Sequence, residues 1–267
     1  MPLMGSLYVG SSGLQTSQNA LNTTAHNLSN VDTLGYTRQQ VQQSNKTYNT
    51  LSVNPDSIAN QQTGLGVTYS RVKQVRDIFL DTTYRRESGR CTFYQTTTET
   101  MEEVESLLGE LNGEAFQTNM NDLWTSVQEL VKDPSSSIVQ GLLVQRAGEF
   151  IERAVNIYEG MTFYQNNLNN QIAQKVDIIN DYGRKIIRLN EQIRCVEAGG
   201  VERANDYRDT RNKLLDELGS LVNISVSEAA FGEVAVRIEN VDFIKGETCY
   251  EIALDQDETT GFYTPYW

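Results

Sequence analysis

The stretch MTFYQNNLNNQIAQKVDIINDYGRKIIRLNEQIRCV, residues 161–196, carries the strongest periodic signal in the chain. Apolar or aromatic residues recur in ten steps over 35 residues, a mean spacing of 3.5. That is the period of a coiled-coil strand, so we expect one long helix packed against helices near 93–131 and 205–221. On this pattern Leu189 is a core position, and Asn190 lies on an adjacent, exposed face. The stripe consists of Met161, Tyr164, Leu168, Ile172, Val176, Ile179, Tyr182, Ile186, Leu189, Ile193 and Val196.

Helical periodicity extends on both sides of this stretch. It begins near Asp77, and serines at 135–137 can cap the start of the long helix. Glycines and prolines mark where helices should end, because neither continues a helix well. The expected boundaries are a break at Asn112-Gly113, stops at Asp133-Pro134 and Gly199-Gly200, and a shorter helix capped by Asn205 or Asp206 that runs to Leu221.

The C-terminal residues alternate in the manner of β-strands. Three runs place apolar side chains at every second position, and glycine-containing turns separate them. We therefore predict a mainly α protein with a smaller β part: an elongated helical bundle or coiled-coil rod with an antiparallel β module near its C-terminal end. The runs are Ile224/Val226, Val234/Val236/Ile238 and Tyr250/Ile252/Leu254, with turns at Phe231-Gly232 and Lys245-Gly246.

The N-terminal segment carries half of a helical seam. Leucine recurs at every seventh position, and no Asp, Glu, Lys or Arg occurs from Met1 to Val31. A self-sufficient seam needs two apolar positions per heptad, and glycines and hydroxyl residues lower the helix propensity here. We expect a helix that is marginal alone and forms mainly when docked. The leucines are Leu7, Leu14, Leu21 and Leu28.

Residues 29–72 read as turn-rich and extended. Asn27 and Asn30 suit a helix C-terminus, and Gly35 can adopt the positive φ that turns the chain. The stretch GVTYSRV, residues 66–72, alternates as a strand does.

Composition narrows the class of protein. The 267 residues are 39% hydrophobic and carry a formal net charge of −13, which disfavours nucleic-acid backbones and anionic membranes. No run approaches a membrane span or a secretory signal, so by that test the protein is cytosolic unless another export route is used. The single histidine, His26, lies in the weak first helix, and known catalytic, nucleotide and metal motifs are missing. We expect no enzyme activity and predict no catalytic, cofactor-binding or metal-ligating residues.

The segment SSGLQTSQNALNTTAHNLSNVDTLGYTRQ resembles the N-terminal signature of bacterial flagellar axial proteins, which are the rod, hook and hook-associated subunits. The stretches GLGVTYSRVKQVRDIFLDTTYRRES (64–88), LNEQI (189–193) and ANDYRDTRNKLLDEL (204–218) are more narrowly similar to the hook-associated members at the hook–filament junction. Asn212 departs from the aspartate usual there. The motif positions are Gly13, Asn27, Asn30, Val31, Thr33, Gly35, Tyr36, Arg38 and Gln39.

The resemblance implies a structural subunit of the flagellum that links hook to filament and self-associates through terminal helices. Its partners would be identical subunits in a ring, the hook protein, adjacent hook-associated or filament proteins, an export chaperone and the type III export apparatus. It would lie outside the cell, exported without a cleaved signal peptide. The family ends in a C-terminal helix that is missing here, so we expect an N-terminal portion of a longer protein or a truncated gene product. The leucine seam would be completed by that helix or by a neighbouring subunit.

Two other hypotheses stay open: another axial subunit of the hook or rod, and a cytosolic coiled-coil adaptor. The long helical stretch at 138–196 favours the junction subunit over a hook subunit, which would be β-rich soon after residue 75. The expected domain organisation has three segments. These are an N-terminal axial segment at 1–75, a helical rod at 76–222 and the start of a β-rich domain at 223–267.

Overall fold

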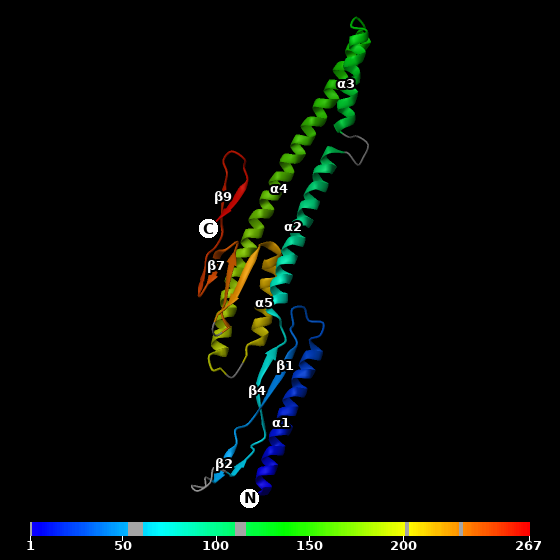
Figure 1. Ribbon diagram of the computed structural model, residues 1–267. Coiled ribbons are helices and arrows are strands. Elements are labelled where there is room, and N and C mark those ends of the chain that lie inside the picture. The colour runs from blue at the N-terminus through cyan, green and yellow to red at the C-terminus, as the bar shows by residue number, and fades with distance from the viewer. Residues whose placement is uncertain (1, 53–60, 110–115, 201–202, 230–231) are drawn as a thin grey trace. The chain divides into compact units, whose positions relative to one another are not determined.

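Helices make up most of the chain, and the short strands pair in antiparallel sheets (Figure 1). The structure is a computed structural model that describes residues 2–52, 61–109, 116–200, 203–229 and 232–267. The prediction of a mainly α protein with a smaller antiparallel β part is confirmed. In the described residues the helices are α1 (Pro2–Ser29), α2 (Ile78–Leu108), α3 (Phe116–Lys132), α4 (Ser137–Glu197) and α5 (Asn205–Leu221). The strands are β1 (Gln39–Asn45), β2 (Asn49–Ser52), β3 (Gln61–Thr63), β4 (Val67–Gln74), β5 (Ile224–Glu228), β6 (Val234–Ile238), β7 (Val241–Lys245), β8 (Thr248–Cys249), β9 (Ala253–Gln256) and β10 (Tyr263–Tyr266).

The chain forms two compact units. The first comprises Met1–Ser88 and Asp181–Glu251, and the second comprises Gly89–Asn180 and Ile252–Trp267. These units cut across the three segments expected from the sequence, because α2 and α4 each contribute residues to both. The three-segment division stays a prediction.

The 61-residue helix α4 follows from the periodicity of residues 161–196. Ile186 and Ile193 are fully buried, and Leu189 is half-buried, so the stripe faces inward along this part of the helix. The helix ends two residues before Gly199, as predicted, and Gly200 takes a φ of 68°. The expectation for Asn190 was wrong: its side chain is 4% exposed, and it is held by hydrogen bonds that the period does not reveal.

In the first unit, the end of α4 and helix α5 pack with a four-stranded antiparallel sheet in the order β5-β6-β7-β8. Gly183 lets the sheet approach α4 closely, since an added Cβ would lie 2.6 Å from both the Phe243 ring and the Cys249 Sγ. The core is apolar and consists of Ile186, Ile193, Leu215, Leu218, Val234, Val236, Ile238, Phe243 and Ile244.

The same unit holds an antiparallel pair of strands, β1 and β4, beside α1 (Figure 1). The sequence predicted β4 but not β1, because QQVQQSN has one apolar residue and no alternation. The register shifts between Gln42 and Gln43, and the strands β2 and β3 pair beyond it.

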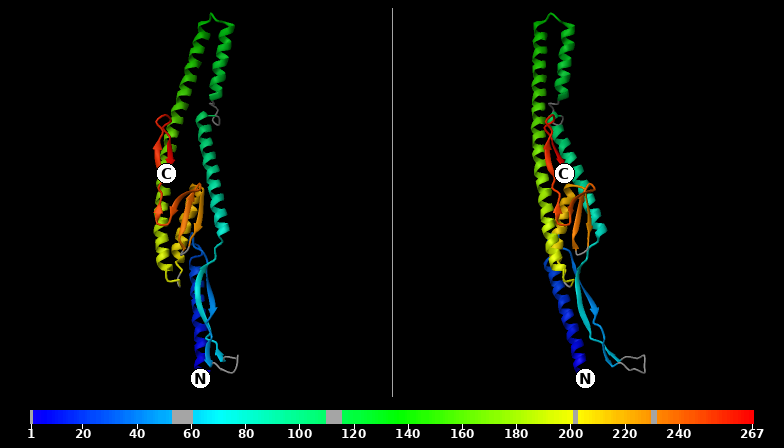
Figure 2. Two further views of the ribbon diagram at one scale, coloured as in Figure 1. Left: turned by 60° about the vertical axis from the view of Figure 1, so that its left-hand side comes forward. Right: turned by 90° about the vertical axis from the view of Figure 1, so that its left-hand side faces the viewer.

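In the second unit, α2 and α3 both contact α4. Arg153 Nη2 donates to the Leu107 carbonyl at 3.2 Å, and the Phe116 and Phe150 rings lie 5.3 Å apart. The β9–β10 hairpin runs along α4 (Figure 2), where Asn169 Nδ2 donates to the Gly261 carbonyl at 2.7 Å. The predicted stop at Asp133-Pro134 is confirmed, whereas Asn112-Gly113 lies outside the described residues.

Two boundary predictions were wrong. Ala204, rather than Asn205 or Asp206, is the N-cap of α5, and its N–H donates to the Glu197 carboxylate at 3.1 Å. The third β run is also displaced, since Tyr250 and Ile252 precede β9. The backbone of Ile252 instead pairs with the Asn180 side chain. Of the predicted turns, Gly246 (φ 60°) and Gly232 (φ 77°) take positive φ, while Phe231 lies outside the described residues.

Candidate functional site

The leucine stripe of α1 lies on the surface of its unit. Leu7, Leu14, Leu21 and Leu28 are 69%, 72%, 69% and 74% exposed. Isolated exposed leucines are common, but these four recur at every seventh position along one face of α1, and together they form the leucine strip. The predicted self-assembly seam is therefore available for contact on the described part of the first unit.

A polar face of α1 packs against the strand pair. Ser12 and Thr16 are buried, and the Val67 N–H donates to Ser12 Oγ at 3.3 Å. Gly66 (φ 83°) makes this approach possible, because a Cβ there would lie 2.2 Å from Ser12 Oγ. Lys46 Nζ also lies 4.8 Å from the Tyr8 ring centroid. Small uncharged residues thus serve the docking of α1 within its own chain, while the leucines stay outside.

The flagellar-type motif forms the turn that joins α1 to β1. The Asn27 amide pairs with both backbone groups of Gln39: Oδ1 accepts from the N–H at 2.9 Å, and Nδ2 donates to the carbonyl at 2.8 Å. The Tyr36 hydroxyl donates to the same Asn27 Oδ1 at 2.7 Å. Burial raises the pKa of Tyr36, and nearby Asp209 adds to the shift. Three motif residues are therefore joined by direct hydrogen bonds.

Other motif residues shape the turn itself. Asn30 Nδ2 donates to the His26 carbonyl at 3.0 Å, and Thr33 Oγ1 donates to Asn30 Oδ1 at 3.2 Å. Gly35 has a φ of 87°, as predicted, which favours glycine over residues with a side chain. Val31 and Arg38 are exposed, and an added Cβ at Gly13 would meet no atom within 4 Å among the described residues. The structure therefore gives packing reasons for part of the motif.

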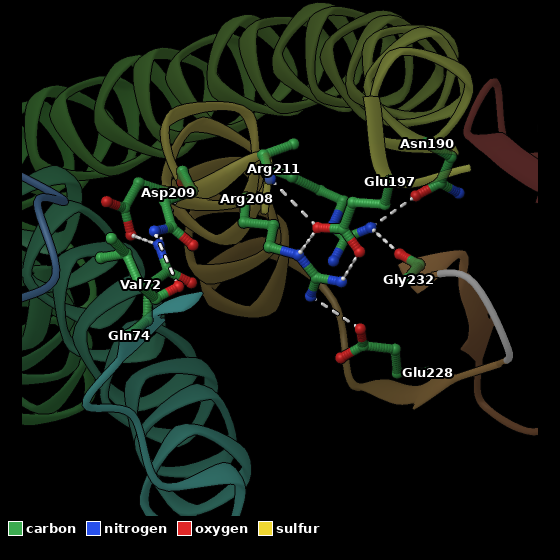
Figure 3. Close-up of polar contacts among 11 residues, drawn as sticks. Val72, Gln74, Asn190, Glu197, Arg208, Asp209, Arg211, Glu228 and Gly232 are labelled. Carbon is green, nitrogen blue, oxygen red and sulfur yellow. Dashed lines mark hydrogen bonds and ion pairs between the residues drawn. The ribbon is translucent and has the colours of Figure 1, made fainter. Parts of the chain in front are cut away.

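The turn is anchored to α5 through Asp209. The Thr37 N–H donates to Asp209 Oδ2 at 3.2 Å. Gln74 Nε2 donates to Asp209 Oδ1 at 2.8 Å (Figure 3). Burial raises the pKa of Asp209, while the hydrogen bonds from Thr37 act in the opposite direction. One buried carboxylate therefore binds both the turn after α1 and the end of β4.

A second polar cluster joins the end of α4 to α5 and β5. The Arg208 guanidinium donates to both carboxylate oxygens of Glu197, at 2.7 and 2.8 Å, and to Glu228 at 2.7 Å (Figure 3). Burial is the largest single influence on the pKa of Glu197 and disfavours its ionisation. The hydrogen bonds from Arg208 and the Ala204 N–H, together with the charges of Arg208 and Arg203, outweigh burial and lower the pKa. The hydrogen bond to Glu197 raises the pKa of Arg208. A bidentate pair of this kind fixes geometry as well as charge.

Arg211 lies deeper, 2% exposed, on the same face of α5. Its Nη1 donates to Asn190 Oδ1 at 2.9 Å and to the Gly232 carbonyl at 2.5 Å (Figure 3). Burial, with the nearby charge of Arg208, lowers the pKa of Arg211 to about 10, so it stays protonated at neutral pH. Asn190 also pairs with both backbone groups of Val234, at 2.9 and 3.3 Å.

One device recurs at four asparagines that lie on helices. Each uses its side-chain amide to bind both a backbone N–H and a backbone carbonyl of an extended segment, much as a neighbouring strand would. The partners are Gln39 for Asn27, Val234 for Asn190, Ile252 for Asn180, and Gly261 with Tyr263 for Asn169. These side chains attach loops and strands to helices at fixed positions.

The sequence pattern of α5 did not by itself assign a role to its arginines. A signal was present: Arg208, Arg211, Leu215 and Leu218 follow one another at steps of 3, 4 and 3, which puts both arginines on the core face of the helix. Arginines on such a face need buried partners. Within the described residues no group of three His, Cys, Asp or Glu could hold a metal ion, and no helix is long and apolar enough to cross a bilayer.

Comparison with known proteins first identifies the class of protein. Residues 7–37, which contain the leucine stripe and most of the turn, match the family described as flagella basal body rod protein. Helix α1 and most of the motif turn thus lie in a segment shared with flagellar basal body rod proteins. Residues 101–264, more than half of the chain, match the flagellar hook-associated protein FlgK helical domain. The chain belongs to the FlgK family of flagellar hook-associated proteins.

Individual relatives agree with this assignment. Flagellar hook-associated protein 1 of Bacillus subtilis (strain 168) is 34% identical over 216 residues, which cover 80% of this chain and 42% of that protein. The protein of the same name from Escherichia coli (strain K12) is 27% identical over 246 residues, covering 91% and 43%. The chain thus spans less than half the length of these relatives.

The fold has a solved counterpart. The flagellar hook junction protein FlgK from Burkholderia pseudomallei matches with a TM-score of 0.55 at 17% identity, over 69% of this chain and 32% of that one. The resemblance read from the sequence is therefore confirmed at the level of family.

Proposed function

We propose that this chain is part of a structural, non-enzymatic subunit that joins the hook to the filament of the bacterial flagellum. Family membership supports the proposal, and the observation that carries it is the exposed leucine strip on an uncharged helix. The four leucines form one half of a seam, and the other half is a helix from another part of the full-length protein or from a neighbouring copy.

The energetics favour contact only within an assembly. Fully burying a leucine contributes about 1.5–3 kcal/mol, so four leucines that are roughly 70% exposed offer about 4–8 kcal/mol together. Association of two free molecules costs about 4–15 kcal/mol in lost freedom of motion. The two ranges overlap, so the strip alone gives at most weak association of two free molecules in solution. It becomes effective where an ordered array holds the helices in place, because most of that entropy has then been lost already.

The absence of charged side chains from the N-terminal segment also favours contact between subunits in an assembly. No Asp, Glu, Lys or Arg occurs from Met1 to Val31, so identical helices can lie side by side without repulsion between like charges. The proposed partners are identical subunits in a ring, the hook protein, and adjacent hook-associated or filament proteins. We also propose that the protein acts outside the cell, and that the flagellar type III apparatus and a chaperone export it.

The test places Leu21→Asp in the full-length gene and expresses it in a strain that lacks the native gene. A buried unpaired carboxylate is costly, so hook tips should lack the subunit, swimming should fail, and filament protein should appear in the medium. The control is Leu34→Asp, because Leu34 is 82% exposed and lies outside the strip. Motile flagella with Leu21→Asp, together with loss of motility for Leu34→Asp, would contradict the proposal.

A further inference from the structure

A pocket of about 200 Å³ lies in the first unit, among the end of β4, the start of α2, α5 and the strands β5 and β6. Its wall is strongly basic, although the chain as a whole is acidic. Asp81 and Glu228 are the acidic residues that line it among the described residues. The basic residues that line it are Lys73, Arg76, Arg85, Arg203, Arg208 and Arg211.

The nearby carboxylates are already engaged with some of these cations. Arg76 Nε lies 2.5 Å from Asp81, and Arg85 Nε lies 2.7 Å from Asp216. Arg208 binds Glu197 and Glu228, as described above. Arg211 has a different environment, because its hydrogen-bond partners in the described residues are neutral: the Asn190 amide oxygen and the Gly232 carbonyl. Its buried positive charge therefore lacks an ion pair within the described part of the chain.

Two of the arginines that line this pocket also have a guanidinium nitrogen without an acceptor among the described residues. Arg211 Nε and Arg85 Nη2 are buried without a hydrogen-bond partner among the described residues. The two side chains are 2% and 7% exposed, so bulk water does not reach them freely. Buried donors are nearly always satisfied in proteins, and unsatisfied donors on charged groups are especially costly. Burial also lowers the pKa of Arg211, which is the shift that a bound anion would reverse.

We propose that this pocket binds a small oxyanion, of the phosphate or carboxylate type, that accepts hydrogen bonds from the buried arginines. Planar guanidinium groups match the oxygens of such ions in both geometry and charge. A volume of about 200 Å³ holds one small ion with a few waters and is too small for a nucleotide or a peptide. The inference is independent of the proposed role at the hook–filament junction.

Binding there would stabilise the part of the unit that anchors α1. The pocket is lined by Gln74 and Asn205, and Gln74 also donates to Asp209, which holds the turn after α1. An anion that holds β4, α2 and α5 together should therefore raise the stability of the first unit in a saturable way.

The experiment measures thermal unfolding of the purified chain at pH 7 in phosphate, in acetate and in chloride, all at equal ionic strength. Phosphate should raise Tm with saturation, and isothermal titration should give a matching Kd. The variant Lys73→Gln/Arg203→Gln removes two exposed lining charges without touching the Arg208 or Arg211 hydrogen bonds. Its affinity should fall about tenfold, from the loss of two nearby charges. Lys132→Gln, on α3 in the second unit, should leave affinity unchanged.

Equal Tm in phosphate and chloride, or equal phosphate affinity in the wild type and the double variant, would overturn the proposal. The measurement in acetate distinguishes a carboxylate ligand from a phosphate ligand. Saturable stabilisation by acetate as strong as that by phosphate supports a carboxylate ligand, such as an acidic side chain from another segment. Stabilisation by phosphate alone supports a free phosphate ion. Arg211→Lys keeps the charge but loses the Nε donor, so it should bind phosphate more weakly than the wild type does.

Discussion

Replacing Asn190 by alanine should destabilise the protein far more than replacing its apolar neighbour Leu189. Asn190→Ala leaves the Val234 N–H and carbonyl without their partner and removes one acceptor from Arg211. Val234 is 3% exposed, so water cannot readily replace the lost amide. Each buried polar group left unpaired costs about 1–3 kcal/mol, which for the two backbone groups gives roughly 2–6 kcal/mol.

Two smaller effects refine that range. Alanine has a higher helix propensity than asparagine by roughly 0.5 kcal/mol, which offsets part of the loss. Arg211 Nη1 keeps the Gly232 carbonyl, so its charge is not wholly stranded. We expect a net loss of about 3–4 kcal/mol for Asn190→Ala. Leu189 is half-buried, so Leu189→Ala should cost about 1–2 kcal/mol, less than a fully buried leucine.

Urea unfolding followed by far-UV circular dichroism gives the free energies. Because α4 contributes to both units, hydrogen exchange of the segment containing Val234 should be measured as well. Faster exchange there assigns the loss of stability to the first unit. The matched control is Asn170→Ala, since Asn170 is an exposed asparagine on the same helix and should change stability by under about 0.5 kcal/mol. A cost for Asn190→Ala that equals the control, or that is smaller than the cost of Leu189→Ala, would refute the reasoning.

Three further predictions concern the first unit. Gly66→Ala forces a side chain into the left-handed region and toward Ser12, so it should cost roughly 1–3 kcal/mol and speed proteolysis of α1. Gly64→Ala should do neither, because no atom of the described residues would lie nearer than 3.7 Å to the added Cβ. Because the pKa of Glu197 is lowered in the fold, its pairing with Arg208 stabilises the protein at pH values above the unfolded pKa of about 4.3. This stabilisation is lost as the pH falls through the folded pKa. The urea midpoints at pH 7 and pH 3 should therefore differ less in Glu197→Gln than in the wild type. Because the α1 seam is incomplete, amides of residues 7–28 should exchange faster in the purified protein than those of α5; equal protection would contradict this.

The sequence by itself determined the long helices, several of their ends and the family. The 3.5-residue spacing at 161–196 records which side of a helix faces apolar neighbours, and this is a local property that needs no knowledge of the partner. The positive φ of Gly35 was predictable for the same reason, because the steric restriction lies within one residue. The incomplete seam of Leu7, Leu14, Leu21 and Leu28 could likewise be read directly from spacing.

Only the tertiary structure decided which polar residues are buried and what they bind. Asn190 looked like an exposed neighbour of the stripe, yet it joins Val234, 44 positions further along the chain. Asp209 binds Thr37 across 172 positions, and Ser12 meets Val67 across 55. Apolar burial follows an average pattern along a helix, whereas a hydrogen bond depends on one donor and one acceptor that meet only when distant segments have folded together.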